Sequence, residues 1–148
     1  MSDERVLIDR WFVDLFSEGD LEAADEILAD DISYHGPESV SPRAAKTPKD
    51  IKRYVKKYHE TFPDFRYEVD IVFGEGDRLC AHWTAEGTQE DDLFGIEGSG
   101  EDFHDEGLNV FRFEDGRIAE IWSYWDTLGM VQQLDIISPL GLAAAQRD

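Results

Sequence analysis

Residues 103–134 read FHDEGLNVFRFEDGRIAEIWSYWDTLGMVQQL. Two apolar-rich runs in this stretch flank Asp115-Gly116, a dipeptide that accepts the positive φ angles of a two-residue hairpin turn. The pattern therefore predicts two antiparallel strands joined at this turn. A symmetric hairpin pairs Asn109 with Trp122, and Gly107 with Tyr124.

Side chains alternate between the two faces of a strand, so the predicted register also assigns the faces. One face would carry Asn109, Phe111, Trp122, Tyr124 and Asp126. The other would carry Leu108, Val110, Arg112, Ala119, Ile121 and Trp125. Neither face has the regular polar residues of a solvated sheet surface. We therefore expect helices to cover one face and a second copy of the chain to cover the other, which predicts a homodimer.

Asp126 ends the second predicted strand, just before the helix-like run 127–134. A carboxylate beside Trp122 and Tyr124 would be partly removed from water, which raises its pKa toward the range useful for proton transfer. The alternative is that Asp126 or Thr127 caps the following helix, because Asp and Thr are favoured at that position. Spacing alone leaves both interpretations open.

The length of 148 residues fits one domain with a sizeable core. We expect a single domain over residues 1–137 and a loose tail over residues 138–148. No apolar run reaches the roughly 20 residues that span a bilayer, and no signal peptide precedes Asp3, so a cytoplasmic location is expected. Cys80 is the single cysteine, which excludes a disulfide framework and predicts a small buried apolar side chain.

Acidic residues dominate the composition: 34 Asp and Glu face 14 Lys and Arg, for a net charge of −20. Such a surface repels nucleic acid and anionic membranes, so neither is an expected partner. The acids are spread along the whole chain, which is not typical of a disordered acidic tail. We interpret them as an adaptation to high salt, where screening removes the self-repulsion.

Apolar residues at helical spacing predict three helices in the first half of the chain. The first ends at Gly19, and its stripe consists of Ile8, Trp11, Phe12, Leu15 and Phe16. A short helix capped by Asp20 follows. The third begins at Thr47-Pro48 with Asp50 three residues after the cap. Tyr54 and Tyr58 lie on its apolar stripe, where such tyrosines either line a cavity or belong to the core.

Residues 65–73 alternate as in a half-buried strand, and a turn at 74–77 leads into a second strand over 78–88. A symmetric turn would place His82 on the inner face, whereas a one-residue bulge would reverse that. The acidic, Gly-rich residues 89–102 are expected to form a loop, such as a lid. With a short strand at 32–35, this order predicts an α+β fold with a pocket between the helices and a curved sheet.

His35 precedes a turn at Gly36-Pro37, at the mouth of the expected pocket, although a histidine there is otherwise solvated or makes a structural hydrogen bond. The four histidines have no metal-ligand spacing, and the sequence contains neither a Gly-rich phosphate loop nor a nucleophile elbow. We expect no metal and no cofactor. The classes of function that remain are acid–base chemistry and binding.

Several segments, taken in order, resemble the SnoaL-like polyketide cyclases of the nuclear transport factor 2-like superfamily. They are His35-Gly36-Pro37, Phe62-Pro63-Asp64-Phe65, Gly76-Asp77-Arg78 through Trp83, Gly87-Thr88, Asp115-Gly116-Arg117-Ile118-Ala119-Glu120-Ile121-Trp122, Asp126 and Gln132-Gln133-Leu134. The resemblance covers about residues 5–136. It implies a cone-shaped α+β barrel with a deep pocket, dimeric through the outer sheet face.

The resemblance also implies that Asp126 matches the family's acid–base carboxylate, which removes a proton next to a carbonyl in an aldol-type ring closure. His35 matches a family position near the pocket. The sequence departs from many relatives at Gln89, where they carry His. It also departs in the loop Glu97-Gly98-Ser99-Gly100-Glu101, which usually reads Pro-Thr-Gly-Lys.

The leading hypothesis is a cofactor-free cyclase, isomerase or lyase that acts on a hydrophobic carbonyl compound. Asp126 would take the proton, and His35, His82 or Asn109 would hydrogen-bond the developing enolate oxygen. The alternative is a non-catalytic module that binds a small molecule in the same pocket or uses the sheet to dimerise. The expected site residues are catalytic Asp126 and His35, and pocket-lining His82, Asn109, Trp122, Tyr124 and Tyr58.

Overall fold

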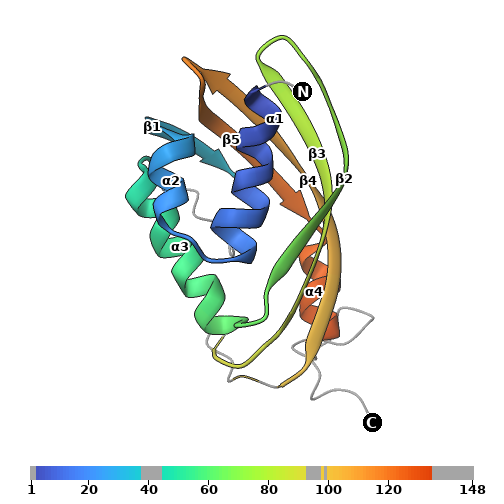
Figure 1. Ribbon diagram of the computed structural model, residues 1–148. Coiled ribbons are helices and arrows are strands. Elements are labelled where there is room, and N and C mark those ends of the chain that lie inside the picture. Colours follow the sequence, from blue (N-terminus) through green and yellow to red (C-terminus); the bar gives the residue numbers. More distant parts are fainter. Residues whose placement is uncertain (1–2, 38–44, 93–97, 99, 135–148) are drawn as a thin grey trace.

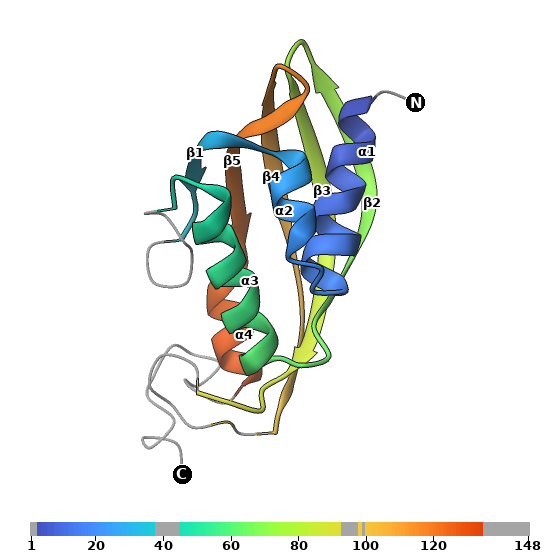
Figure 2. The same cartoon turned by 60° about the vertical axis from the view of Figure 1, so that its left-hand side comes forward.

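The computed structural model describes residues 3–37, 45–92, 98 and 100–134. Three helical segments pack on one face of a curled sheet, and a last helix lies at one end of it (Figure 1 and Figure 2). The α+β class is therefore confirmed. The elements in chain order are α1 (Asp3–Asp9), the π-helical η1 (Arg10–Ser17), α2 (Glu22–Ile27), β1 (Leu28–His35), α3 (Pro48–Thr61), β2 (Arg66–Glu75), β3 (Arg78–Thr88), β4 (Asp102–Glu114), β5 (Arg117–Trp125) and α4 (Thr127–Gln133).

The five strands form one sheet in the order β1-β5-β4-β3-β2. Strands β2 to β5 are antiparallel, as expected, but β1 runs parallel to β5. The sheet is thus mixed, and it is curled into an open cone instead of closing into a barrel. Strand β1 also begins at Leu28, four residues earlier than the short strand predicted at 32–35.

The first helical stripe forms the centre of the core. Ile8, Trp11, Phe12, Leu15 and Phe16 are all at most 2% exposed. The Trp11 and Phe111 rings meet edge to face with centroids 5.6 Å apart, which ties the π-helical segment to the inner face of β4. Helix α3 begins as predicted: the Thr47 side chain accepts from the Asp50 N–H, and the Asp50 carboxylate accepts from the Thr47 N–H.

The β4–β5 turn is confirmed at Asp115-Gly116, whose φ angles are 51° and 77°. The register predicted from it is wrong beyond the first two pairs. A bulge between Arg112 and Phe113 shifts the pairing by one residue, so Asn109 lies opposite Ser123 and Gly107 lies opposite Trp125. Ile121, Ser123 and Trp125 therefore share the inner face with Asn109. Trp122 and Tyr124 lie on the outer face.

The β2–β3 hairpin differs from prediction in a similar way. Its turn is Gly76-Asp77, and a second register shift falls between Val69 and Ile71. Ile71 pairs with His82, whereas Val69 pairs with the buried Trp83. His82 consequently lies on the outer face, opposite to the placement predicted from a symmetric turn.

Two predictions lie partly or wholly outside the described residues: the central part of the loop 89–102 and the tail 138–148. Cys80 is half-buried on the outer face rather than buried, and burial raises the pKa of its thiol. In the described part of the chain, none of the helices is both long enough and apolar enough to cross a membrane.

Candidate active site

A small cavity lies inside the cone, between α3, α4 and the inner face of the sheet. It holds about 10 Å³ of free space, which is roughly the room that a single water molecule needs. Its wall is mostly aromatic. The lining residues are Tyr58, Phe65, Tyr67, Trp83, Ala85, Phe103, Asp105, Trp125 and Met130.

Gly107 allows two tryptophans to enter this wall side by side. A Cβ atom at Gly107 would lie 2.5 Å from Cζ2 of Trp83 and 2.8 Å from Cβ of Trp125. Without that atom, the two indole rings approach with centroids 6.4 Å apart. The Trp83 Nε1–H donates to Oδ1 of the buried Asn109 at 3.0 Å. Asn109 is therefore inside the cone, as predicted, but its side-chain oxygen already has a partner.

Asp105 is the carboxylate on the cavity wall, and the sequence interpretation did not single it out. It is 7% exposed on the inner face of β4, opposite Ala85. Its Oδ1 accepts from the Glu106 N–H at 2.9 Å. Burial raises the pKa of Asp105 to about 6, and the charges of Asp126 and Glu106 add to this effect. The sequence did indicate an inward position for Asp105, because Asp105 alternates in step with Asn109 and Phe111 along the strand.

Tyr58, predicted to line the pocket, contributes its ring to the cavity wall from α3. It lies edge to face with Tyr54 at 5.3 Å and with Phe65 at 4.7 Å. Burial raises the pKa of Tyr58 far above the usual range for a phenol, and the nearby Tyr34 and Asp105 add to the effect. The Tyr58 hydroxyl therefore stays protonated and can act as a hydrogen-bond donor at neutral pH.

Asp126 directly follows Trp125 but does not point into an aromatic hollow. Its side chain is exposed, and its Oδ1 accepts from the Gly129 N–H at 2.8 Å, which makes it the N-cap of α4. A Cβ atom at Gly129 would approach Oδ2 of this carboxylate too closely, so a side chain there would require the Asp126 side chain to shift. The predicted neighbours Trp122 and Tyr124 lie on the other face of the sheet. The capping alternative describes the geometry.

His35 is also on the outer face, because β1 pairs His35 with Trp122. The two rings stack with centroids 5.1 Å apart and an interplanar angle of 14°. The His35 Nε2 lies 2.7 Å from Oε2 of Glu120, whose Oε1 accepts from Arg112 at 3.0 Å. Burial opposes ionisation of Glu120, but these two partners outweigh it and lower its pKa. His35 is thus part of an ion-pair network outside the cone.

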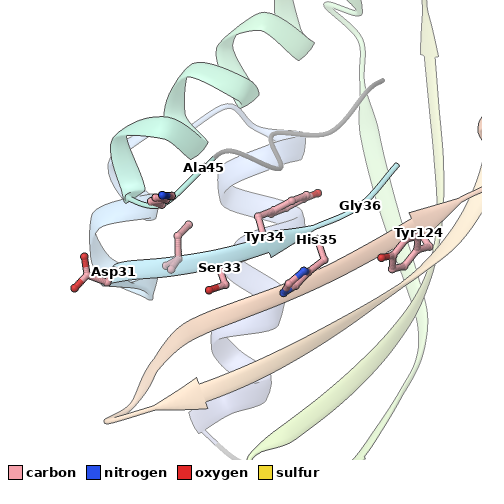
Figure 3. Close-up of a pocket in the computed structure, with 9 residues that line it drawn as sticks. Asp31, Ser33, Tyr34, His35, Gly36, Ala45 and Tyr124 are labelled. Carbon is pink, nitrogen blue, oxygen red and sulfur yellow. The ribbon is translucent and has the colours of Figure 1, made fainter. Parts of the chain in front are cut away.

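A separate, open depression of about 530 Å³ lies at the β1 edge (Figure 3). Tyr34 and His35 point to opposite sides of β1 there, and Tyr124 extends from the neighbouring β5. Burial raises the pKa of Tyr34 to about 12, and this inward residue belongs to the core. Gly36 and Ala45 also border the depression.

His82, another predicted pocket residue, also lies outside the cone. Its Nδ1 lies 2.7 Å from the exposed Asp70 on the outer face. The structure therefore brings together only Tyr58 and Asn109 of the predicted set within the cone. Within the described ranges, no three His, Cys, Asp or Glu side chains are grouped to hold a metal ion.

Comparison with known proteins decides the family. The sequence pattern of the SnoaL-like polyketide cyclases matches residues 6–134. The chain belongs to this family. A search of curated proteins finds no match.

Solved structures with the SnoaL-like fold superpose over most of the chain. TsrD from Streptomyces laurentii has 24% identity and a TM-score of 0.80, and the match covers 91% of this chain and 96% of that one. A presumed polyketide cyclase from Acidithiobacillus ferrooxidans has 26% identity and a TM-score of 0.80, with 90% and 94% covered. IdmH from Streptomyces antibioticus, also a presumed polyketide cyclase, has 27% identity and a TM-score of 0.76, with 90% and 99% covered.

Proposed function

We propose that this SnoaL-like chain is a cofactor-independent acid–base enzyme for a small hydrophobic carbonyl compound. The reaction class is removal of a proton from the carbon next to a carbonyl, as in an aldol-type cyclisation, an isomerisation or a related lyase step. The observation that carries the proposal is a buried carboxyl group, Asp105, on the wall of an aromatic cavity inside the cone.

We keep Asp126 as a proposed acid–base group because the resemblance to the family implies that role. Its position differs from the predicted one, since its side chain is exposed at the end of β5. Its backbone N–H donates to Glu106 O at 3.4 Å, and its charge contributes to the raised pKa of Asp105. One carboxyl group is thus buried and the other exposed at the end of β5. Burial raises the pKa of Asp105, so its carboxyl group can hold a proton at a pH where an ordinary carboxyl group is ionised.

Tyr58 is the proposed donor to the enolate oxygen that develops during proton removal. It lines the same cavity as Asp105, and burial keeps its hydroxyl protonated. A donor aimed at developing negative charge in a site shielded from water contributes strongly to the rate. The outer-face residues His35 and His82 have no part in this proposal.

The test is exchange of hydrogen for deuterium next to the carbonyl of α-tetralone, followed by NMR in D₂O. Exchange above the buffer rate is the minimal reaction of an acid–base enzyme. Asp126→Asn should reduce the exchange about 100-fold or more, while Asn still caps α4. Glu114→Gln, an exposed change at the opposite end of β4 from Asp105, is the matched control. Unchanged exchange in Asp126→Asn would remove Asp126 from the mechanism.

The second candidate is a binding module without catalysis, and the geometry of Asp126 favours it. An exposed carboxylate that caps a helix has a structural role that explains its presence without chemistry. Wild-type protein that binds α-tetralone but never exceeds the buffer exchange rate would select this candidate.

We also propose a homodimer through the outer face of the sheet. Four large apolar side chains are 47–61% exposed there: Ile71, Phe73, Leu108 and Tyr124. Exposed apolar side chains on β2, β4 and β5 of one sheet face are typical of an interaction surface. Sedimentation analysis should find a dimer that Phe73→Asp converts to a monomer. A monomeric wild-type protein at micromolar concentration would contradict the proposal.

The net charge of −20 supports a further proposal, that the protein is adapted to high salt. Added salt screens repulsion between exposed carboxylates, so the unfolding midpoint should rise between dilute buffer and molar NaCl. Equal midpoints in the two conditions would remove this proposal.

A further inference from the structure

Two buried polar atoms on the cavity wall have no hydrogen-bond partner among the described residues: Asp105 Oδ2 and Trp125 Nε1. Burial without a partner is unfavourable for any polar group, and such positions in folded proteins call for a specific explanation. One atom is an acceptor and the other is a donor. Both residues line the same cavity.

Two comparable polar atoms of this wall do have partners. Trp83 Nε1, from the tryptophan beside Trp125, donates to Asn109. The second oxygen of Asp105, Oδ1, accepts from the Glu106 N–H. That bond fixes the carboxylate and leaves Oδ2 free. Trp11 Nε1 also lacks a partner among the described residues, but Trp11 packs against Phe16 and Phe111 and does not line the cavity.

We propose that Asp105 Oδ2 and Trp125 Nε1 form the polar end of a ligand subsite that takes a phenol or enol hydroxyl of a flat, uncharged ring compound. The hydroxyl would donate to Asp105 Oδ2, and its oxygen or an adjacent carbonyl would accept from the Trp125 N–H. The inference rests on the proposed function in that it uses the same cavity, and it adds the functional group by which the ligand is recognised.

The remaining wall restricts the rest of the ligand. Phe65, Phe103 and Met130 offer apolar contact, and aromatic rings pack well against each other edge to face. Among the described lining residues, there is no lysine or arginine to balance an anionic ligand, and Asp105 would repel one. A neutral ring compound with one acidic hydroxyl fits this combination.

Ring binding requires the cavity to widen, because its free space accommodates only about one water molecule. Met130 is the wall residue best suited to move, since its side chain is unbranched and flexible. It is contributed by α4, at the end of the cone. The subsite at Asp105 and Trp125 would keep its geometry while this side chain turns away.

The test compares two ring compounds of the same shape, β-naphthol and naphthalene, by titration calorimetry with the full chain near neutral pH. Wild-type protein should bind β-naphthol at least about 10-fold more tightly than naphthalene. Asp105→Asn and Trp125→Phe should each remove most of that preference and leave naphthalene binding within a few-fold of wild type. Glu114→Gln is the control, since it removes a charge from an exposed residue at the other end of β4 from Asp105.

Equal affinity of wild type for both compounds would overturn the inference, as would an equal loss of preference in Glu114→Gln. Thermal unfolding of each variant identifies any that fails to fold, and the remaining variant then decides. This binding test and the exchange test of the proposed function can fail independently. A hydroxyl preference without α-tetralone exchange keeps the subsite and removes the enzyme, whereas exchange without the preference does the reverse.

Discussion

The inner and outer faces of the same sheet differ in the burial and hydrogen bonding of their carboxylates. On the inner face, Asp105 is buried among aromatic rings and one of its oxygens has no partner in the described part of the chain. On the outer face, Glu120 is bound on both oxygens, by His35 and by Arg112. An ion pair at the surface adds little to the free energy of unfolding, and its groups are not free to react. A buried carboxyl group with an oxygen that lacks a hydrogen-bond partner can instead bind a ligand.

The largest expected difference between the faces concerns phenylalanine. Phe111 is 0% exposed on the inner face, and Phe73 is 61% exposed on the outer face. Phe111→Ala should cost about 3–5 kcal/mol of unfolding free energy because it leaves a cavity in the core. Phe73→Ala should cost less than about 0.5 kcal/mol in dilute protein.

Urea unfolding measures both values, since urea carries no charge and does not screen the acidic surface. Similar losses of unfolding free energy for the two variants would contradict the assignment of Phe111 to the core and Phe73 to the surface. A loss for Phe73→Ala that grows with protein concentration would instead report the proposed dimer.

The second prediction uses pH to test the burial of Asp105. Its pKa is raised from 3.8 to about 6 in the folded chain. Between these values the folded state holds a proton that the unfolded state has released, so stability should fall as pH rises from about 4 to about 6. Asp105→Asn removes this penalty. The variant should be more stable than wild type at pH 7, by up to roughly 2–3 kcal/mol, and equal to it near pH 4.

Urea titrations of wild type and variant across this range provide the measurement. Because only the difference between the two proteins is used, other titrating groups cancel to first order. A difference that does not change with pH would show that Asp105 is solvated in the folded state.

A third, smaller effect is expected at the helix cap. Asp126→Ala should cost about 1 kcal/mol, since α4 loses the acceptor for the Gly129 N–H. Asp126→Asn should cost only a few tenths of a kcal/mol because Asn caps equally well. The pair separates capping from catalysis: Asn should restore stability but not proton exchange. Equal stability of the Ala variant and wild type would contradict the cap.

The smallest effect is expected on the outer network. Glu120→Gln should cost less than about 1 kcal/mol at pH 7, since the His35 side chain is 42% exposed and solvent screens the pair. The pKa of Glu120 is lowered in the folded chain, so the contribution is present above its ordinary value and is lost as pH falls below it. A larger loss at pH 4 than at pH 7 would have the wrong sign.

Local signals in the sequence predicted the local features well. The Thr47-Pro48 start of α3 and the Asp115-Gly116 turn depend on residues within three positions of each other, and both are found where expected. The buried stripe from Ile8 to Phe16 follows in the same way from helical spacing.

Placement across strands was predicted less well, because register depends on single inserted residues. The bulges near Phe113 and Asp70 give no local signal, yet each reverses the faces of the residues beyond it. They moved Trp122, Tyr124 and His82 to the outer face. Asp105 was missed for a different reason: its parity with Asn109 marked it as interior, but the acid–base role was assigned to Asp126, at the neighbouring end of β5.

The pairing of β1 with β5 has a consequence for biosynthesis. Leu28 finds its partner Ile118, and His35 finds Trp122, only after β2, β3 and β4 have been synthesised. Until then the amphipathic N-terminal helices have no complete sheet to cover. Contacts so distant along the chain slow folding, and the apolar faces of these helices stay open to aggregation until β5 is in place.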